Sequence, residues 1–529
     1  MAQDALASLD ENRAPQPSPL WRPARGWAIA RLVPVPLIAL LLGLVSALGF
    51  APLDLWPITL IAFALLIPLI ERVRSARGAL LAGWCFGLGQ FTLGLNWIAT
   101  AFTYQAAMPA WLGWVAVLLL SLYLAVYPAL AVLAAWLARR GGLLPLALVL
   151  GAAWIVTEWL RATLFTGFAW NPIGVALLLP GAGAAKLIGT YGLGAIVILA
   201  GALLVALARR AWREALLLAL PVLAAFGYGM ATRAPPAAPG AGPLIRVVQP
   251  NIGQDQKWSP DFEARNFGIL AGLSGVPGAA PRLLFWPEVA IPAYLEDEPG
   301  WRDAIARLLG PRDLILTGGI SVAWADPAKR KAAAARNSLF VMDAGGRLRG
   351  RYDKAHLVPY GEYLPMRPIL SAIGLSRLAP GDMDFQSGPG PRTLALPGFG
   401  TVGGQICYEM IFSGHVVDPA HRPAFLFNPS NDAWFGRWGP PQHLAQARLR
   451  AIEEGLPIVR STPTGISALI DADGRLLQSL PWRTAGAIEA HLPPAHAPTP
   501  FARLGNALCF AFAGLLLLAA AFASRRIRR

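Results

Sequence analysis

Three short polar segments of this sequence contain residues that can perform acyl transfer. Glu288 follows Trp-Pro, Lys354 follows Arg-Tyr-Asp, and Cys407 follows Gly-Gly-Gln-Ile. A thiol has a pKa of about 8.5, so a base must remove its proton before the sulfur attacks a carbonyl carbon. The Glu288 carboxylate can take that proton, while the Lys354 ammonium and the backbone N–H of Tyr408 can stabilise the resulting oxyanion. Cys407 at a strand-to-helix turn is also expected to gain from the helix dipole, which favours the thiolate.

Each of these residues also has an ordinary structural explanation. A single cysteine after an apolar strand is usually a core residue, Glu288 after Trp-Pro can cap a helix, and a lysine such as Lys354 usually lies on the surface. Glu362 and Glu409, in the same segments, can be exposed carboxylates. Spacing along the chain does not bring these residues together, so the motifs alone leave both explanations open.

The composition of the chain requires a large apolar environment. Of its 529 residues, 55% are hydrophobic and only 14% are charged, whereas soluble proteins carry about 25% charged residues. The net charge is +15, but residues 233–503 hold 27 Lys and Arg against 23 Asp and Glu. The rest of the chain holds 18 against 7. The excess positive charge therefore flanks apolar segments, which is typical of a membrane protein and argues against nucleic-acid binding.

Eight apolar runs approach or exceed the roughly 20 residues that cross a bilayer. The predicted spans are 33–50, 53–70, 79–98, 111–137, 143–160, 190–208, 214–231 and 505–523. Arginines concentrate between spans at 72–77, 139–140 and 209–213, and at both termini. This asymmetry predicts cytoplasmic termini and places residues 233–503 on the opposite face, which is the periplasm in a bacterium with two membranes.

The polar region between the last two spans has the pattern of an α/β domain. Strand-like runs are expected at 244–250, 282–287, 313–320, 338–342, 401–407 and 424–429, helices near 261–274, 299–309 and 441–455, and hairpins at 343–346 and 471–474. Such alternation predicts an α/β or layered αββα domain. The predicted parts are a cytoplasmic tail (1–32), a seven-span domain (33–232), a Pro-rich linker (233–243), the catalytic domain (244–495), an eighth span (505–523) and a cytoplasmic tail (524–529).

Longer motifs around the three segments resemble the nitrilase superfamily and its Glu-Lys-Cys triad. The strings are WPE, YDKAHLVPYGEYLP and GGQICYE. Seven spans before this domain and one after it are similar to the bacterial apolipoprotein N-acyltransferase family. Further matches are QPNI at 249–252, NPSNDAWFG at 428–436, QH at 442–443 and RST at 460–462. The chain departs from the family's Asn-rich pattern at Thr462-Pro-Thr-Gly, which affects that loop and not the triad.

The resemblance implies an αββα domain on the outer face of the inner membrane. It implies transfer of an acyl chain from a membrane phospholipid, through a cysteine thioester, to the N-terminal amine of a diacylglyceryl-cysteine apolipoprotein. The triad then consists of Glu288 as general base, Lys354 as oxyanion stabiliser and Cys407 as nucleophile. Family positions that support the site or substrate match Trp258, Glu362, Tyr408, Glu409, Asn431, Trp434 and Arg460. We expect a monomer whose partners are the two lipid substrates, with no cofactor and no metal.

Two other functions fit parts of the pattern. A membrane-tethered carbon–nitrogen hydrolase (amidase) would give the thioester to water and act on a lipid-linked or periplasmic amide. A scaffold or transporter would usually carry more ionisable residues within its spans than Glu158 and Arg161.

The 161–189 loop is predicted on the same side as the catalytic domain. Its Trp170 lies either near the site or in an interfacial aromatic belt.

Overall fold

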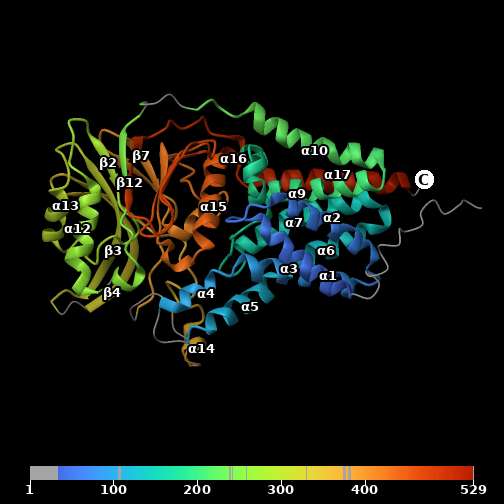
Figure 1. The fold of residues 1–529 in the computed structure, drawn as a ribbon, viewed down its shortest axis with the longest axis horizontal. Coiled ribbons are helices and arrows are strands. Elements are labelled where there is room, and N and C mark those ends of the chain that lie inside the picture. Colours follow the sequence, from blue (N-terminus) through green and yellow to red (C-terminus); the bar gives the residue numbers. More distant parts are fainter. Residues whose placement is uncertain are drawn as a thin grey trace, which may run out of the picture.

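The computed structural model describes residues 34–527 except 105–108, 237–239, 241, 258, 329–330, 373, 375–376 and 379–382. A bundle of apolar helices and a two-sheet domain lie next to each other along the longest axis (Figure 1). The linker after α10 and the segment before α17 both run from one part to the other. The sheet domain is therefore attached to the bundle at both of its ends.

The bundle contains the helices before the first strand and the last helix of the chain. They are α1 Val35–Ser46, α2 Trp56–Arg72, α3 Ala76–Gly94, α4 Ile98–Ala101, α5 Leu112–Leu124, α6 Val126–Ala138, α7 Leu143–Thr163, α8 Leu178–Gly181, α9 Ala185–Ala208, α10 Trp212–Ala231 and α17 Ala507–Ile527. Glycines let α1 and α3 approach closely, because a Cβ on Gly43 would lie 1.9 Å from the Phe86 carbonyl oxygen. Small residues at helix contacts are typical of bundles in lipid.

Each predicted span falls on a helix, but not all of these helices have the length of a span. Within the described residues, five continuous helices are long and apolar enough to cross a membrane, or six if the bent pair α3 and α4 counts as one. The five are Leu112–Gly141, which joins α5 and α6, and α7, α9, α10 and α17. The first two predicted spans form helices of 12 and 17 residues. A multi-helix membrane part is present, and the count of eight stays a prediction.

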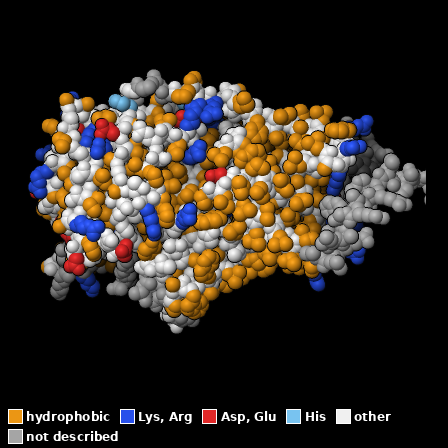
Figure 2. Space-filling model, in the orientation of Figure 1, with side chains coloured by type: hydrophobic (Ala, Val, Ile, Leu, Met, Phe, Trp, Pro, Cys, Tyr) orange, Lys and Arg blue, Asp and Glu red, His pale blue; other side chains and the backbone are white. Residues whose placement is uncertain are grey.

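The surface of the bundle differs from that of the sheet domain. Figure 2 shows a broad hydrophobic area over the helices, with Lys and Arg at the end of the bundle far from the sheets. Exposed large apolar side chains on the outermost helices include Leu216, Leu220 and Leu223 of α10 and Leu515, Leu518 and Phe522 of α17. A broad exposed apolar surface over helices long enough to cross a membrane indicates that the surroundings of the bundle are lipid.

The sheet domain contains two six-stranded sheets. The first has the order β12-β1-β2-β3-β4-β5 and the second β11-β10-β9-β8-β7-β6. The first comprises β1 Leu244–Gln249, β2 Arg282–Phe285, β3 Leu314–Asp326, β4 Lys331–Asp343, β5 Leu348–Asp353 and β12 Gly486–His491. The second comprises β6 Thr393–Leu396, β7 Gly400–Gly404, β8 Phe425–Pro429, β9 Ile458–Ser461, β10 Ala468–Ile470 and β11 Leu476–Ser479. In each sheet three central strands are parallel and the outer strands antiparallel.

The two sheets pack face to face between helices. Phe285 of β2 contacts Phe427 of β8 with ring centroids 4.8 Å apart. Helices α12 Glu263–Ser274 and α13 Pro299–Ala306 cover the outer face of the first sheet, and α15 Gly439–Glu454 covers the second (Figure 1). The predicted αββα arrangement is thus present. Because α15 lies between the second sheet and the bundle, it contacts both parts of the molecule.

Candidate active site

The three residues predicted to perform acyl transfer lie where strands of both sheets end. Glu288 follows β2, Lys354 follows β5 and Cys407 follows β7. Their exposed fractions are 6%, 1% and 4%. Lys354 Nζ lies 3.7 Å from Glu288 Oε1, and both charges act on the Cys407 thiol. The packing of the two sheets, rather than any local motif, brings a carboxylate, an ammonium and a thiol into one buried site.

Cys407 has an unusual backbone and a protonated thiol. Its φ is +52°, a strain of about 1–3 kcal/mol for a residue with a side chain. Burial and the Glu288 carboxylate raise the pKa of the thiol, and Lys354 lowers it only in part. Cys407 opens a five-residue 3₁₀ helix, η8 Cys407–Ile411, which is much shorter than the helix expected after the strand, and the gain from a helix dipole stays a prediction. The sulfur therefore needs a base.

Lys354 is held as an ammonium by two carboxylates. Its Nζ lies 2.9 Å from Glu362 Oε2. Burial alone lowers the pKa of Lys354, but Glu362 and Glu288 together outweigh it and raise that pKa. Asn337 Nδ2 donates to Glu288 Oε1 at 2.6 Å and to Glu362 Oε1 at 3.0 Å. The Lys354 side chain is thus kept positively charged at neutral pH.

Glu409 ties the segment after Lys354 to the segment that carries Cys407. Its Oε1 accepts from the Tyr352 hydroxyl and the Ala355 amide, each at 2.7 Å, and its Oε2 accepts from the Ile406 amide at 2.7 Å. Burial raises the pKa of Glu409 to about 7, although these donors oppose the shift. The carboxylate therefore supports both chain segments rather than lying exposed.

The loop after α7 connects the site to the bundle. The Tyr408 hydroxyl donates to the Gly167 carbonyl at 3.2 Å, and Arg161 Nη1 donates to the Trp170 carbonyl at 2.8 Å. Trp170 is fully buried, and its Nε1 donates to Gln442 Oε1 of α15 at 2.8 Å. Trp170 is therefore an interior contact between bundle and sheet domain, and the alternative of an interfacial anchor is wrong.

The remaining predicted supporting residues lie at the sides of this site. Arg460 at the end of β9 pairs with Asp432, with Nη2 at 2.6 Å from Oδ2. Asn431 Nδ2 donates to Gln254 Oε1 at 2.8 Å. The Trp434 ring lies edge-on to Tyr104 at 5.8 Å. Trp258 lies outside the described residues.

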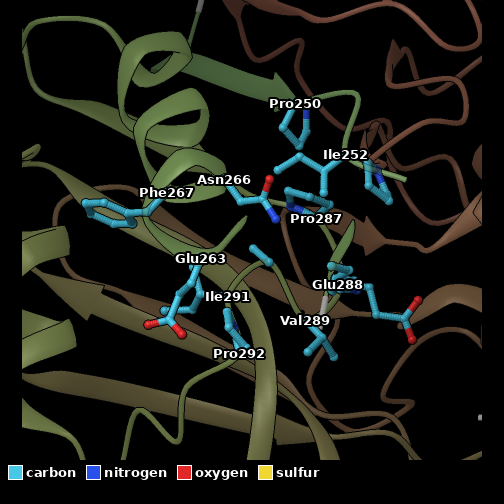
Figure 3. Close-up of a pocket in the computed structure, with 13 residues that line it drawn as sticks. Pro250, Ile252, Glu263, Asn266, Phe267, Pro287, Glu288, Val289, Ile291 and Pro292 are labelled. Atoms are coloured by element: carbon cyan, nitrogen blue, oxygen red, sulfur yellow. The ribbon is translucent and has the colours of Figure 1, made fainter. Parts of the chain in front are cut away.

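Two cavities adjoin these residues. One of about 20 Å³ lies between α12 and the segment after β2, and Figure 3 shows the Glu288 and Glu263 carboxylates pointing in opposite directions there. This volume has room for about one water molecule, which is too small for an acyl chain. A second cavity of about 360 Å³ lies between the bundle and the sheet domain. Its lining includes Tyr104, Asp255 and Arg483.

Sequence reasoning missed two polar residues of the site. Asn337 donates hydrogen bonds to both Glu288 and Glu362. In the sequence it could be noticed only as a polar amide directly before the apolar run 338–342. Lys257 Nζ donates to the Glu288 carbonyl at 2.9 Å. Burial lowers the pKa of Lys257 to about 8. Both residues come close to Glu288 only through the tertiary fold.

The fold and site together define a carbon–nitrogen hydrolase domain joined to an apolar helical bundle. The family model "Carbon-nitrogen hydrolase" matches residues 244–497, and "Apolipoprotein N-acyltransferase N-terminal domain" matches residues 42–203. The apolipoprotein N-acyltransferase of Rhodopseudomonas palustris is 37% identical over 507 residues, which cover 91% of this chain and 93% of the relative. That of Nitrosomonas europaea is 34% identical over 505 residues, covering 92% and 98%. This chain belongs to the apolipoprotein N-acyltransferase family.

Solved structures resemble the sheet domain. The amidase from Nesterenkonia sp. is 15% identical, with a TM-score of 0.34, and the match covers 49% of this chain and 94% of the amidase.

Proposed function

We propose that this protein transfers a fatty acyl chain from a membrane phospholipid to the N-terminal amine of a diacylglyceryl-cysteine apolipoprotein, completing lipoprotein maturation. Membership of the apolipoprotein N-acyltransferase family supports this function. The observation that carries it is a buried thiol beside a carboxylate and an ammonium, within a domain joined to an apolar bundle. It acts as a multi-pass protein of the inner membrane.

In the first half-reaction the phospholipid acylates Cys407. The Glu288 carboxylate takes the thiol proton, and the sulfur attacks the ester carbonyl carbon. The Lys354 ammonium and the Tyr408 N–H hold the oxyanion. When the carbon–oxygen bond breaks, Glu288 returns the proton to the leaving oxygen and a lysophospholipid departs. The acyl chain is now a thioester on Cys407.

In the second half-reaction the apolipoprotein amine attacks this thioester. An α-amine has a pKa of about 7.7–8.0, so part of it is neutral near physiological pH. Glu288 accepts the proton that the nitrogen loses as the amide forms. The carbon–sulfur bond breaks, and the sulfur recovers the proton from Glu288. Burial of Cys407 supports transfer to an amine over transfer to water, since it limits access of water to the thioester.

The topology forms part of this proposal. The sheet domain, with the predicted limits 244–495, lies in the periplasm, and eight spans place both termini in the cytoplasm. Two features support this orientation. The last described helix, α17, ends far from the sheets (Figure 1), and surface Lys and Arg lie at that same end of the bundle (Figure 2).

One experiment tests the function directly. Purified full-length protein is incubated with phospholipid vesicles alone and then analysed by intact mass and peptide mapping. We expect one fatty-acyl mass on Cys407, removed when a diacylglyceryl-cysteine peptide is added and recovered on that peptide's amine. Free fatty acid without peptide acylation would mean that Cys407 gives its acyl group to water, as a hydrolase does, and not to an amine. Absence of any acyl mass on Cys407 would contradict the thioester route.

A further inference from the structure

The strained turn at the nucleophile is held by side chains from two other elements. A non-glycine residue keeps a positive φ, here +52° at Cys407, only where its surroundings impose it. His443 Nε2 lies 3.0 Å from the Cys407 carbonyl oxygen, and Asn428 Nδ2 lies 3.4 Å from the same oxygen. The shorter of these two bonds comes from α15. A carbonyl oxygen only accepts, so His443 must carry its hydrogen on Nε2.

The other ring nitrogen of His443, Nδ1, contacts a buried ion pair formed by Arg460 and Asp432. Arg460 Nη2 lies 3.0 Å from His443 Nδ1 and 2.6 Å from Asp432 Oδ2. The side chains of all three residues are fully buried. His443 Nδ1 also lies 3.1 Å from Asp432 Oδ1, so this nitrogen is held between a guanidinium, which only donates, and a carboxylate, which only accepts, while Nε2 donates to Cys407. Burial and the Arg460 charge lower the pKa of His443, and Asp432 opposes them only in part, so the lowered pKa favours a neutral ring.

The helix that carries His443 is itself fixed by the bundle. Gln446 Oε1 accepts from the Asn171 amide, and Glu453 Oε1 accepts from the Thr190 amide at 2.7 Å. With the Trp170 bond to Gln442 described above, three polar side chains of α15 receive hydrogen bonds from the bundle. The position of α15 thus depends on the bundle, and the turn at Cys407 depends on α15.

We propose that His443 is a positioning residue for the nucleophile, braced by Asp432 and Arg460. Its Nε2–H holds the Cys407 carbonyl and so fixes the turn from which the sulfur and the Tyr408 N–H act. This inference rests on the proposed acyl transfer through Cys407. His443 on α15 holds the Cys407 carbonyl, which no described side chain of the motif around Cys407 or of the preceding strand is seen to do.

Two amide substitutions at His443 distinguish its bond to Cys407 from its contacts with Asp432 and Arg460. The glutamine in H443Q can place its amide nitrogen near the position of Nε2. The shorter asparagine in H443N reaches only the position of Nδ1, so it keeps the contacts with Asp432 and Arg460 and loses Cys407. Full-length proteins are reconstituted in phosphatidylethanolamine–phosphatidylglycerol vesicles, and the acyl mass on Cys407 is followed with time.

We expect H443Q to retain most of the wild-type acylation rate. H443N should be about 10- to 100-fold slower, the usual cost of a misplaced reacting group, with an unchanged phospholipid concentration at half-maximal rate. The matched control is Ile452→Ala, which removes a buried side chain about two and a half turns beyond His443 on the same helix. It should lower the unfolding temperature without slowing acylation of the folded protein. Equal rates in H443Q and H443N, whether fast or slow, overturn the proposal.

A second measurement does not depend on acyl transfer. Alkylation of Cys407 by iodoacetamide, located by peptide mapping, is followed against pH. Lys354 lowers the pKa of the thiol, so a displaced sulfur should shift the profile to higher pH in H443N and not in H443Q. Identical profiles overturn the role of His443. If wild-type protein gains no acyl mass while the profiles still differ, the proposed function fails and the role of His443 stands.

Discussion

The chemistry of Cys407 depends on a proton that the resting site keeps on sulfur. Burial and a neighbouring carboxylate both disfavour the thiolate, and a single ammonium offsets only part of this effect. A thiol of raised pKa is unreactive until the carboxylate removes its proton. In the proposed mechanism the same arrangement keeps Cys407 unreactive until a substrate ester arrives, because only a correctly placed carbonyl benefits from the Lys354 charge.

Substitution Glu288→Gln should remove the base and leave the fold intact. The glutamine amide cannot accept the thiol proton, so acylation of Cys407 by phospholipid should fall by roughly 10²–10⁴ at pH 7. Since the pKa of Cys407 is raised, the residual rate should climb with pH as hydroxide supplies the thiolate. The measurement is single-turnover acylation from pH 6 to pH 10. Near-normal acylation at pH 7 would show that another group is the base.

Substitution Cys407→Ser should abolish the stable acyl-enzyme. A hydroxyl ionises at far higher pH than a thiol, so Glu288 and Lys354 cannot generate the alkoxide. The variant should insert into membranes and bind phospholipid vesicles as the wild type does, yet gain no acyl mass. Peptide acylation at the wild-type rate, with no covalent intermediate in either protein, would mean that transfer is direct.

Among the secondary-structure elements, β9 and the turn after β8 are joined by a buried charge pair. The Arg460 and Asp432 side chains are fully buried. Burial by itself raises the pKa of Asp432, but Arg460 and His443 outweigh it and lower that pKa. The pair therefore stabilises the folded protein at a pH above the pKa of a free aspartate, about 3.9. This stabilisation is lost as the pH falls through the lowered pKa of Asp432 in the folded protein.

Substitution Arg460→Met should leave the Asp432 charge without its main partner. Loss of one member of a buried pair costs about 3–5 kcal/mol, so the unfolding midpoint in detergent should drop clearly at pH 7. Below pH 4 the difference from wild type should narrow, because protonation of Asp432 removes the lone charge. The exposed Arg312→Met serves as control and should change stability by less than about 0.5 kcal/mol. A pH-independent difference would show that lost packing, not charge, is responsible.

On the scale of the whole molecule, the sheet domain and the bundle form one continuous structure. Lys186, at the start of α9, pairs with Asp473 of a hairpin in the second sheet at 2.5 Å. Arg475 of the same hairpin pairs with Asp473 at 3.4 Å and donates to the carbonyl of Ala234 in the linker. These contacts, together with α15, join the sheet domain to the membrane part at several points and fix the site relative to the bilayer.

The orientation of the bundle can be tested with fusions. A reporter fused after Arg233 should be active only in the periplasm, and one fused after Arg529 only in the cytoplasm, because the arginine-rich loops remain cytoplasmic. Alkaline phosphatase and a fluorescent protein, assayed in intact cells, give opposite readouts for the two compartments. Activity of both fusions in the same compartment would contradict an eight-span topology.

The amino-acid sequence by itself determined the class of each segment. Apolar periodicity is local, so it indicated the helices of the bundle and the alternating strands of an αββα domain. The residue types of Glu288, Lys354 and Cys407 were compatible with acyl transfer, and the resemblance of the longer motifs to the nitrilase superfamily pointed to these three residues as a triad. Helix length was predicted less well, since α1 spans 12 residues where the apolar run suggested a full crossing.

Only the tertiary structure decided how these segments act on one another. Asn337 lies 49 residues after Glu288 in the chain and contacts it in the fold. His443 likewise lies 36 residues after Cys407 and contacts it. No local sequence pattern encodes such contacts. The raised pKa of the Cys407 thiol also depends on burial, which is a property of the packed molecule. Trp170 is interior for the same reason, because α15 covers it. The distances between side chains and their removal from water are properties of the packed molecule. They determine which groups interact and how they ionise, whereas the residue types alone show only which reactions are possible.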